Sequence, residues 1–188
     1  MINRVIRAAM LDGEFFKEAE ADTSLTQEAL MVVILVAIAG SIGNFIGTLM
    51  NRSFGAALLA LIGALVIGVL NYYVWSYVTY FVGKQLFNAA VDPGELLRVL
   101  GYASGPRVLG VLRFIPCLGW LIAFAGDIWA LIAGFIGAKE ALDLDATKTL
   151  ITVAIGWVII VIISFIIGAV FGVGAAGLGV VSSLLGGS

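Results

Sequence analysis

The chain has 188 residues, of which 62% are hydrophobic and only 12% are charged, and its net charge is −2. Soluble domains are about half apolar and about a quarter charged, so this composition predicts an integral membrane protein in a lipid bilayer. The sequence has no stripe of basic residues, so nothing indicates nucleic-acid binding. The absence of His and the single Cys, Cys117, exclude an internal disulfide, a Cys/His zinc site, a haem protein and a Ser-His-Asp enzyme.

Residues 1–24 are predicted to form a short amphipathic arm. Apolar side chains at 2, 5, 6 and 9 share one helical face between Arg4 and Arg7. Two interpretations are open: a solvated arm that leads into the first span, or a helix that lies on the membrane surface or docks a protein partner. In the second, Phe15 and Phe16 would anchor in the interface. We expect no cleaved signal peptide, because no continuous apolar segment precedes a small-residue cleavage site.

Long apolar runs predict an all-α fold with five transmembrane helices in one membrane domain, 25–173, followed by a Gly-rich apolar tail, 174–188. A hydrocarbon core about 30 Å thick needs about 20 apolar residues. The second run exceeds one span, so its helix is expected to be tilted or to protrude. A capping box from Ser24 to Gln27 precedes the first span, and Asp145 or Thr147 can cap the last. The predicted spans are about 29–51, 55–82, 94–113, 117–138 and 149–171.

Small residues recur every four positions in three of these spans, which predicts close helix packing. Such faces could join helices of one chain or copies in a homo-oligomer. The three stripes are Ala39, Gly43 and Gly47; Ala60, Ala64 and Gly68; and Gly126, Ala130, Gly134 and Ala138.

The end of the second span is aromatic. Tyr and Trp gather where hydrocarbon meets lipid headgroups, so the cluster predicts an interfacial belt. The alternative is the lining of a ligand cavity. The residues concerned are Tyr72, Tyr73, Trp75, Tyr77, Tyr80 and Phe81.

The third span is predicted to be a broken helix. Asp92-Pro-Gly-Glu95 is a strong helix-start signal, with Asp92 as the N-cap, Pro at the first helical position and Glu95 three residues after the cap. Pro106 then removes a backbone donor, and Gly101 and Gly105 weaken the helix further. Either the freed carbonyls serve a functional site lined by protein or water, or neighbouring helices satisfy a proline kink.

Ionisable side chains within the spans form the candidate polar site. Arg98 and Arg113 suit opposite interfaces by extending toward the headgroups. Arg107 would lie about 9 Å inside the Arg113 end and Asp127 about 16 Å into the bilayer, where a carboxylate costs about 2.5–3.5 kcal/mol. We predict that Arg107 and Asp127 pair and fix the third helix to the fourth. Pro106, Tyr102 and Ser104 complete the candidate site.

Asp127 could instead serve as a proton or cation site of a transporter or channel. The chain shows one broken helix and an odd number of spans, without the matching halves of inverted-repeat transporters. Catalysis is not expected, because neither Ser104 nor Tyr102 has a general base at recognisable spacing. We therefore expect no enzyme, no cofactor and no metal.

Basic residues near the span ends predict the topology. One side carries most of them, and the other carries Arg52 and Arg113. This bias places the N-terminus in the cytoplasm and the C-terminus outside. The basic residues of the first side are Arg4, Arg7, Lys17, Lys84, Arg98, Lys139 and Lys148.

Three short segments, Leu100-Gly-Tyr-Ala-Ser-Gly-Pro106, Ile115-Pro-Cys-Leu-Gly-Trp120 and Ile128-Trp129, resemble the Yip family of Ypt/Rab-interacting membrane proteins. The resemblance extends over about Leu25 to Phe171. It implies five membrane spans, a cytoplasmic N-terminus and no catalytic residues. Eukaryotic members bind Rab GTPases in vesicle traffic and have a longer N-terminal region, so the short arm looks more like the prokaryotic branch.

Taken together, these features predict a Yip-like multi-pass protein of the cell membrane with a structural or interaction role. The alternative is a small-solute, ion or proton transporter or channel that uses Arg107, Asp127 and the broken third helix.

Overall fold

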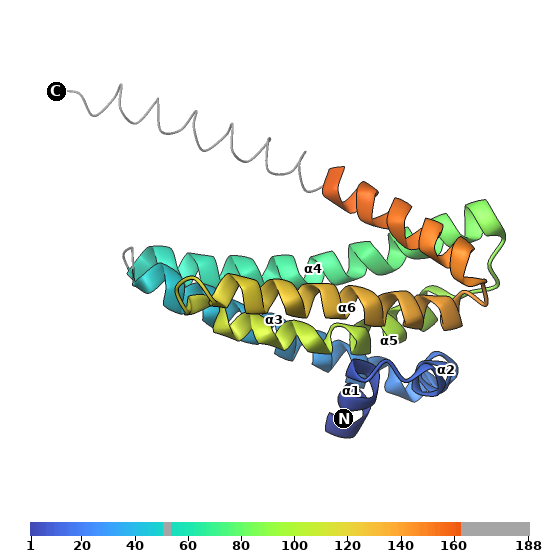
Figure 1. Ribbon diagram of the computed structural model, residues 1–188, viewed down its shortest axis with the longest axis horizontal. Coiled ribbons are helices and arrows are strands. Elements are labelled where there is room, and N and C mark those ends of the chain that lie inside the picture. Colours follow the sequence, from blue (N-terminus) through green and yellow to red (C-terminus); the bar gives the residue numbers. More distant parts are fainter. Residues whose placement is uncertain (51–53, 163–188) are drawn as a thin grey trace.

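The computed structural model describes residues 1–50 and 54–162, and these contain helices and turns without any β-strand (Figure 1). The predicted all-α class is confirmed. The helices are α1 (Ile2–Ala9), α2 (Gly13–Ala21), the 3₁₀ helix η1 (Thr23–Leu25), α3 (Thr26–Leu49), α4 (Phe54–Phe87), α5 (Pro93–Ala103), the 3₁₀ helix η2 (Gly105–Phe114), α6 (Gly119–Ala141) and a last helix, Ala146–Ile162.

Three helical segments of the described ranges are long and apolar enough to cross a membrane: Thr23–Leu49, Phe54–Phe87 and Gly119–Ala141. They correspond to the first, second and fourth predicted spans. The third predicted span is occupied by α5 and η2, and Ala146–Ile162 is a shorter apolar helix where the fifth was predicted. The end of the fifth predicted span, the tail and Arg52 lie outside the described residues.

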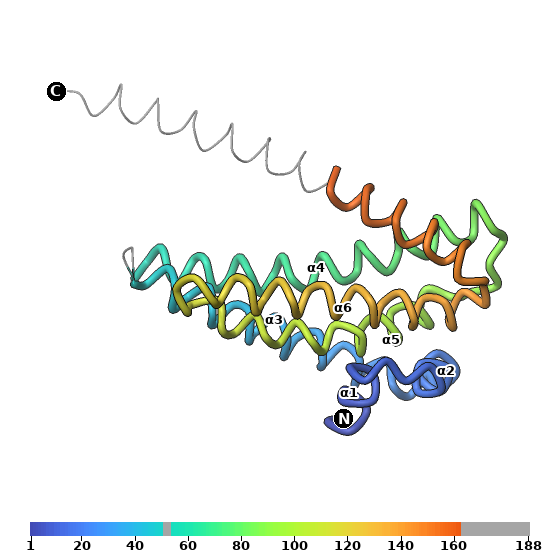
Figure 2. Tube along the Cα trace, viewed as in Figure 1, coloured from blue at the N-terminus to red at the C-terminus, as the bar shows by residue number. Residues whose placement is uncertain are grey.

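Helices α3, α4, α6 and the α5–η2 segment run side by side along the long axis, and α1 and α2 pack across one part of this bundle (Figures 1 and 2). The cap of the first span differs from prediction, because Asp22 rather than Ser24 accepts a backbone hydrogen bond, from Ser24 N at 2.9 Å. Asp145 caps the last helix as predicted, accepting from Lys148 N at 2.9 Å.

Large apolar side chains pack one end of the bundle, which we call the head: α2, α5 and the end of α6. Phe15 and Phe16 are 1% and 0% exposed, so the prediction that they anchor in the membrane interface is wrong. Burial of such side chains is worth about 1.5–3 kcal/mol each where water is the alternative. The largest buried side chains of this cluster are Phe15, Phe16, Leu96, Val99, Tyr102 and Leu142.

Arg98 is also part of the head and does not extend to an interface, contrary to prediction. It is 5% exposed, and its guanidinium donates to the carbonyl oxygens of Ala19, at 2.8 Å, and Glu20. These are carbonyls of the last turn of α2, which lack partners within the helix. The cation therefore holds the end of α2 against α5.

Small residues, rather than large ones, join the other part of the bundle. A Cβ atom on Gly43 would lie 2.4 Å from the carbonyl oxygen of Gly110, and one on Gly126 would lie 2.8 Å from that of Pro106. On α4, a Cβ on Gly68 would lie 3.2 Å from the Cβ of Ala37. One glycine from each of the three predicted stripes thus packs within the chain, and η2 lies in direct backbone contact with α3 and α6.

This close packing predicts opposite effects for two glycines one turn apart on α3. Gly43→Ala should lower the free energy of unfolding by about 1–3 kcal/mol, as overpacking typically does. Gly40→Ala should be neutral or stabilising, because its Cβ would meet nothing within 4 Å and Ala favours a helix over Gly by about 1 kcal/mol. Thermal unfolding in detergent measures both, and equal melting temperatures for the two variants would contradict the packing.

Candidate functional site

The site is built around the change from α5 to η2. Helix α5 starts at Pro93, where the Asp92 N–H donates to Glu95 Oε2 at 3.0 Å. It ends at Ala103, and Ser104 Oγ donates to the Gly101 carbonyl at 2.6 Å. Pro106 has no N–H to offer the carbonyl four residues earlier. The chain continues as a 3₁₀ helix of 10 residues, far longer than the three or four residues usual for this form.

The 3₁₀ form decides which side chains face the bundle interior. With about three residues per turn, positions 104, 107, 110 and 113 fall on one face. All four line the same cavity, whose other walls come from α3, α4, α6 and Trp157 of the last helix. In an α-helix, Arg107 and Arg113 would lie on different faces, because successive residues turn by about 100°.

Both arginines of this face, Arg107 and Arg113, lie close to the carboxylate of Asp127 on α6. Arg107 Nε lies 3.4 Å from Asp127 Oδ1, and Arg113 Nη2 lies 3.6 Å from Oδ2. The predicted Arg107–Asp127 contact is therefore present, and Arg113 reaches the same carboxylate instead of the interface where the sequence placed it. The Asp127 side chain is 45% exposed and the Arg107 side chain 33%.

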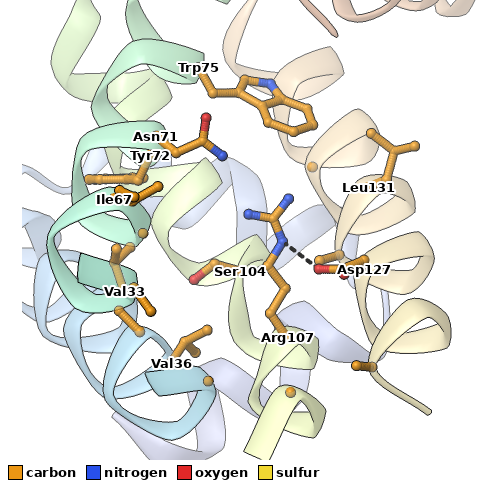
Figure 3. A pocket seen from close by; sticks show the side chains of 18 of the residues that line it. Val33, Val36, Ile67, Asn71, Tyr72, Trp75, Ser104, Arg107, Asp127 and Leu131 are labelled. Carbon is orange, nitrogen blue, oxygen red and sulfur yellow. Dashed lines mark ion pairs between the residues drawn. The ribbon is translucent and has the colours of Figure 1, made fainter. Parts of the chain in front are cut away.

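The cavity has a volume of about 670 Å³ (Figure 3). Figure 3 shows Arg107 pointing between Asp127, Asn71 and Trp75. Its guanidinium carbon lies 5.6 Å from the centre of the Trp75 ring, a cation–π distance. Most of the remaining lining is apolar. The polar side chains of the lining are Ser41, Asn44, Asn71, Tyr72, Ser104, Arg107, Arg113 and Asp127.

The structure separates the other residues of the candidate site. Ser104 lines the cavity, whereas Pro106 and Tyr102 do not. Tyr102 is fully buried in the head, where its hydroxyl donates to Glu28 Oε1 at 2.8 Å and its ring packs on Phe15. Pro106 instead brings its carbonyl against Gly126.

Sequence reasoning missed Arg113, Asn71 and Trp75 as members of the site. The three-residue spacing of Ser104, Arg107, Gly110 and Arg113 is visible in the sequence, but it has meaning only if the segment is a 3₁₀ helix. Trp75 and Tyr72 belong to the aromatic cluster predicted as an interfacial belt, and both line the cavity. Tyr77 and Phe81 of that cluster are 44% and 57% exposed, as a lipid-facing position requires.

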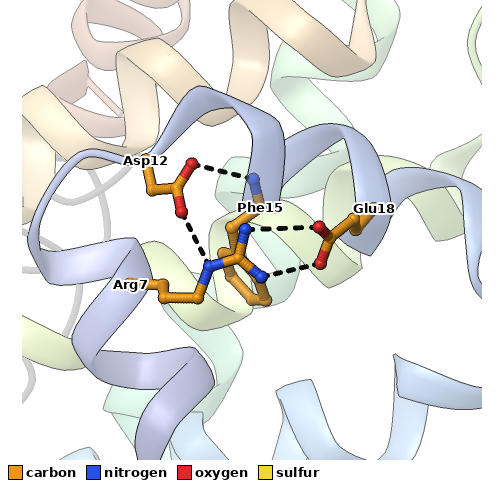
Figure 4. A network of polar contacts seen from close by, with 4 residues as sticks. All are labelled: Arg7, Asp12, Phe15 and Glu18. Atoms are coloured by element: carbon orange, nitrogen blue, oxygen red, sulfur yellow. Dashed lines mark hydrogen bonds and ion pairs between the residues drawn. The ribbon is translucent and has the colours of Figure 1, made fainter.

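A second polar cluster fixes the N-terminal arm (Figure 4). Arg7 Nε donates to Asp12 Oδ2 at 2.7 Å, and its two terminal nitrogens donate to Glu18 at 2.8 and 3.2 Å. Asp12 in turn caps α2 by accepting from Phe15 N at 3.1 Å. The Arg7 hydrogen bond lowers the pKa of Asp12. Trp129 Nε1 donates to the Ala9 carbonyl at 2.7 Å, so the arm is folded onto the bundle.

Glu20 of the head has a buried carboxylate oxygen, Oε2, that is inaccessible to solvent and has no hydrogen-bond partner among the described residues. Burial, and then the negative charges of Asp143, Glu95 and Glu140, raise the pKa of Glu20. Residues 1–50 and 54–162 hold no group of three or more His, Cys, Asp or Glu side chains that could bind a metal ion.

A model of the Yip1 domain family matches residues 10–168. The chain belongs to the Yip1 domain family. The match begins at the end of α1 and includes the head, η2 and the whole Arg107–Asp127–Arg113 triad of this Yip1 protein. The family resemblance inferred from the segments around Pro106 and Pro116 is thereby confirmed, as is the assignment to membrane proteins. No curated protein and no solved structure matches the chain.

Asp127→Asn should destabilise the protein, because two guanidinium groups then share the cavity without a counter-charge. We expect a loss of about 1–3 kcal/mol, below the roughly 3–5 kcal/mol of a fully buried pair, since Asp127 is 45% exposed. Thermal unfolding in a zwitterionic detergent measures the loss. Glu14→Gln, which removes an exposed carboxylate of α2, is the control. An unchanged melting temperature for Asp127→Asn would show that the pair has no structural role.

Glu20→Gln should stabilise the protein at neutral pH. The folded state holds the Glu20 proton more tightly than the unfolded state, so this carboxyl favours folding below its unfolded pKa and opposes it once ionised. The gain should shrink as the pH falls from the raised folded pKa of Glu20 toward about 4.3, the ordinary Glu value, and should be absent below it. Melting temperatures measured as a function of pH check this, with the exposed Glu14→Gln as the control. A gain in stability that is independent of pH would contradict the prediction.

Proposed function

We propose that this Yip1 protein is a non-catalytic membrane scaffold whose head binds a protein partner. The observation that carries the proposal is the folding of the arm onto the bundle, through Phe15, Phe16 and the Arg98 cap. A segment that only leads into the first span has no need of a buried aromatic cluster. A rigid head presents a fixed surface, which reduces the entropic cost of binding.

The surface of the head favours a partner with basic groups. Acidic side chains outnumber basic ones among its described residues, and complementary charge steers association and fixes orientation. The acidic residues are Glu14, Glu18, Glu20, Glu95, Glu140 and Asp143, against Lys17, Lys139 and the buried Arg98. Lys17 already lies 3.5 Å from Glu140 Oε2.

In this proposal the chain crosses the membrane five times, with the head in the cytoplasm. Crossings one, two and four are α3, α4 and α6; α5 and η2 together form the broken third, and the last helix begins the fifth. More basic residues lie at the head end than at the opposite end of the described bundle, and this difference supports the orientation. Lys84, Lys139 and Lys148 all lie at helix ends on that side.

Transport is the second candidate function, and the cavity favours it. A half-exposed carboxylate inside a cavity of about 670 Å³ is what a pathway for an ion or small solute would need. The scaffold and the transporter differ in whether water from either side reaches this cavity.

Single-cysteine labelling decides between them. Cys117 has a positive φ of 63°, so Cys117→Gly is the least strained background. Single cysteines at Ser104 and Ala130, both in the cavity lining, would be exposed to a membrane-impermeant thiol reagent from each side. We expect protection at both, with controls at Lys139 labelled from the cytoplasm and at Leu118 from outside. Labelling at Ser104 and Ala130 would favour transport over the scaffold role. Labelling of Lys139 from outside and of Leu118 from the cytoplasm would contradict the proposed orientation.

A further inference from the structure

The charges of the cavity do not balance. Arg107 and Arg113 contribute two positive charges and Asp127 one negative charge, which leaves a net charge of +1 among the ionisable groups of the lining. Unpaired charge is costly at membrane depth and is normally compensated by a counter-ion. The groups present therefore accommodate one further negative charge.

The cavity also has more hydrogen-bond donors than acceptors. Each guanidinium has five N–H donors and no acceptor, yet Arg107 and Arg113 contact Asp127 only at 3.4 and 3.6 Å, beyond normal hydrogen-bond length. Arg107 Nε has no hydrogen-bond partner among the described residues, and the terminal nitrogens of the guanidinium remain as further donors. Figure 3 shows the guanidinium of Arg107 extending into the cavity beside Asp127, with Asn71 close to its terminal nitrogens.

The remaining walls suit an apolar chain. Apolar side chains flank the charged face on α3, α4 and α6, among them Val33, Val36, Ile67, Ile128 and Leu131. A volume of about 670 Å³ falls in the range of roughly 300–1,000 Å³ typical of ligand pockets. The lining thus combines a cationic, donor-rich centre with apolar walls, which is the complement of an anionic amphiphile.

We propose that this cavity binds a phosphate oxyanion carrying one negative charge, held by Arg107 and Arg113 with Asn71 as a further donor. Arginine favours phosphate because its planar fork can donate two hydrogen bonds to one group. Asp127 limits the net charge to +1, which fits a phosphodiester better than a dianion. The phosphate belongs to a lipid headgroup or to a free solute, and the experiment separates these sources. The inference does not depend on the scaffold role of the head.

The test uses the full chain purified in a neutral detergent and titrated with phosphatidylglycerol, phosphatidylcholine or inorganic phosphate. Native mass spectrometry measures binding, and thermal unfolding measures stabilisation. Phosphatidylglycerol should bind the wild type at one equivalent and raise its melting temperature. Arg113→Gln should weaken this binding at least tenfold. Arg113→Lys, which keeps the charge but not the fork, should give an intermediate affinity. Lys148→Gln, outside the cavity, should leave it unchanged.

Asp127→Asn should raise the affinity for the lipid although it lowers the stability of the unliganded protein. It therefore separates an effect on binding from an effect on folding. This variant raises the net charge of the cavity to +2, so it should bind phosphatidylglycerol more tightly than the wild type and recover stability when the lipid is added. Stabilisation by phosphatidylglycerol alone identifies a lipid headgroup, and stabilisation by inorganic phosphate as well identifies a free oxyanion. Equal affinities in the wild type and Arg113→Gln, or weaker binding by Asp127→Asn, would overturn the proposal.

Discussion

The missing N–H of Pro106 is the constraint on which the membrane part of this protein depends. Without that donor the chain leaves the α-helical pattern after Ala103 and continues as η2. A 3₁₀ helix is narrower than an α-helix and rises about 2 Å per residue. Its backbone approaches α3 at Gly43 and α6 at Gly126 closely enough that a methyl group on either glycine would collide. The same segment carries both arginines of the cavity.

Two kinds of packing meet along the bundle. In the head, large side chains such as Phe16 and Leu96 are fully buried, as the hydrophobic effect favours where water is the competing solvent. Around η2, glycines allow close backbone contact, because lipid competes equally for apolar side chains and only tight packing distinguishes protein from bilayer. This change of packing supports a head that projects from the membrane and a helical part that lies within it.

The two proposals give the cavity and the head different roles within the Yip1 domain. The head is closely packed and acidic, and the arm contributes α2 to it, which suits the proposed binding of a protein. The cavity is cationic at its centre and apolar around it, which suits a ligand from the bilayer. The α5–η2 segment joins the two parts, since α5 belongs to the head and η2 lines the cavity.

The sequence by itself determined the membrane class, the helices α3, α4 and α6, the start of α5 at Pro93, and the pairing of Arg107 with Asp127. These follow from local composition, capping and the cost of a lone charge in lipid, which need no knowledge of distant contacts. Only the tertiary structure decided that Phe15, Phe16 and Arg98 are buried, because their partners are distant in the sequence: Arg98 binds the carbonyl of Ala19, 79 residues away, and Phe15 packs on Tyr102. It also decided the 3₁₀ form of η2, which packing against Gly43 and Gly126 favours, and with it the meeting of Arg113 and Asp127.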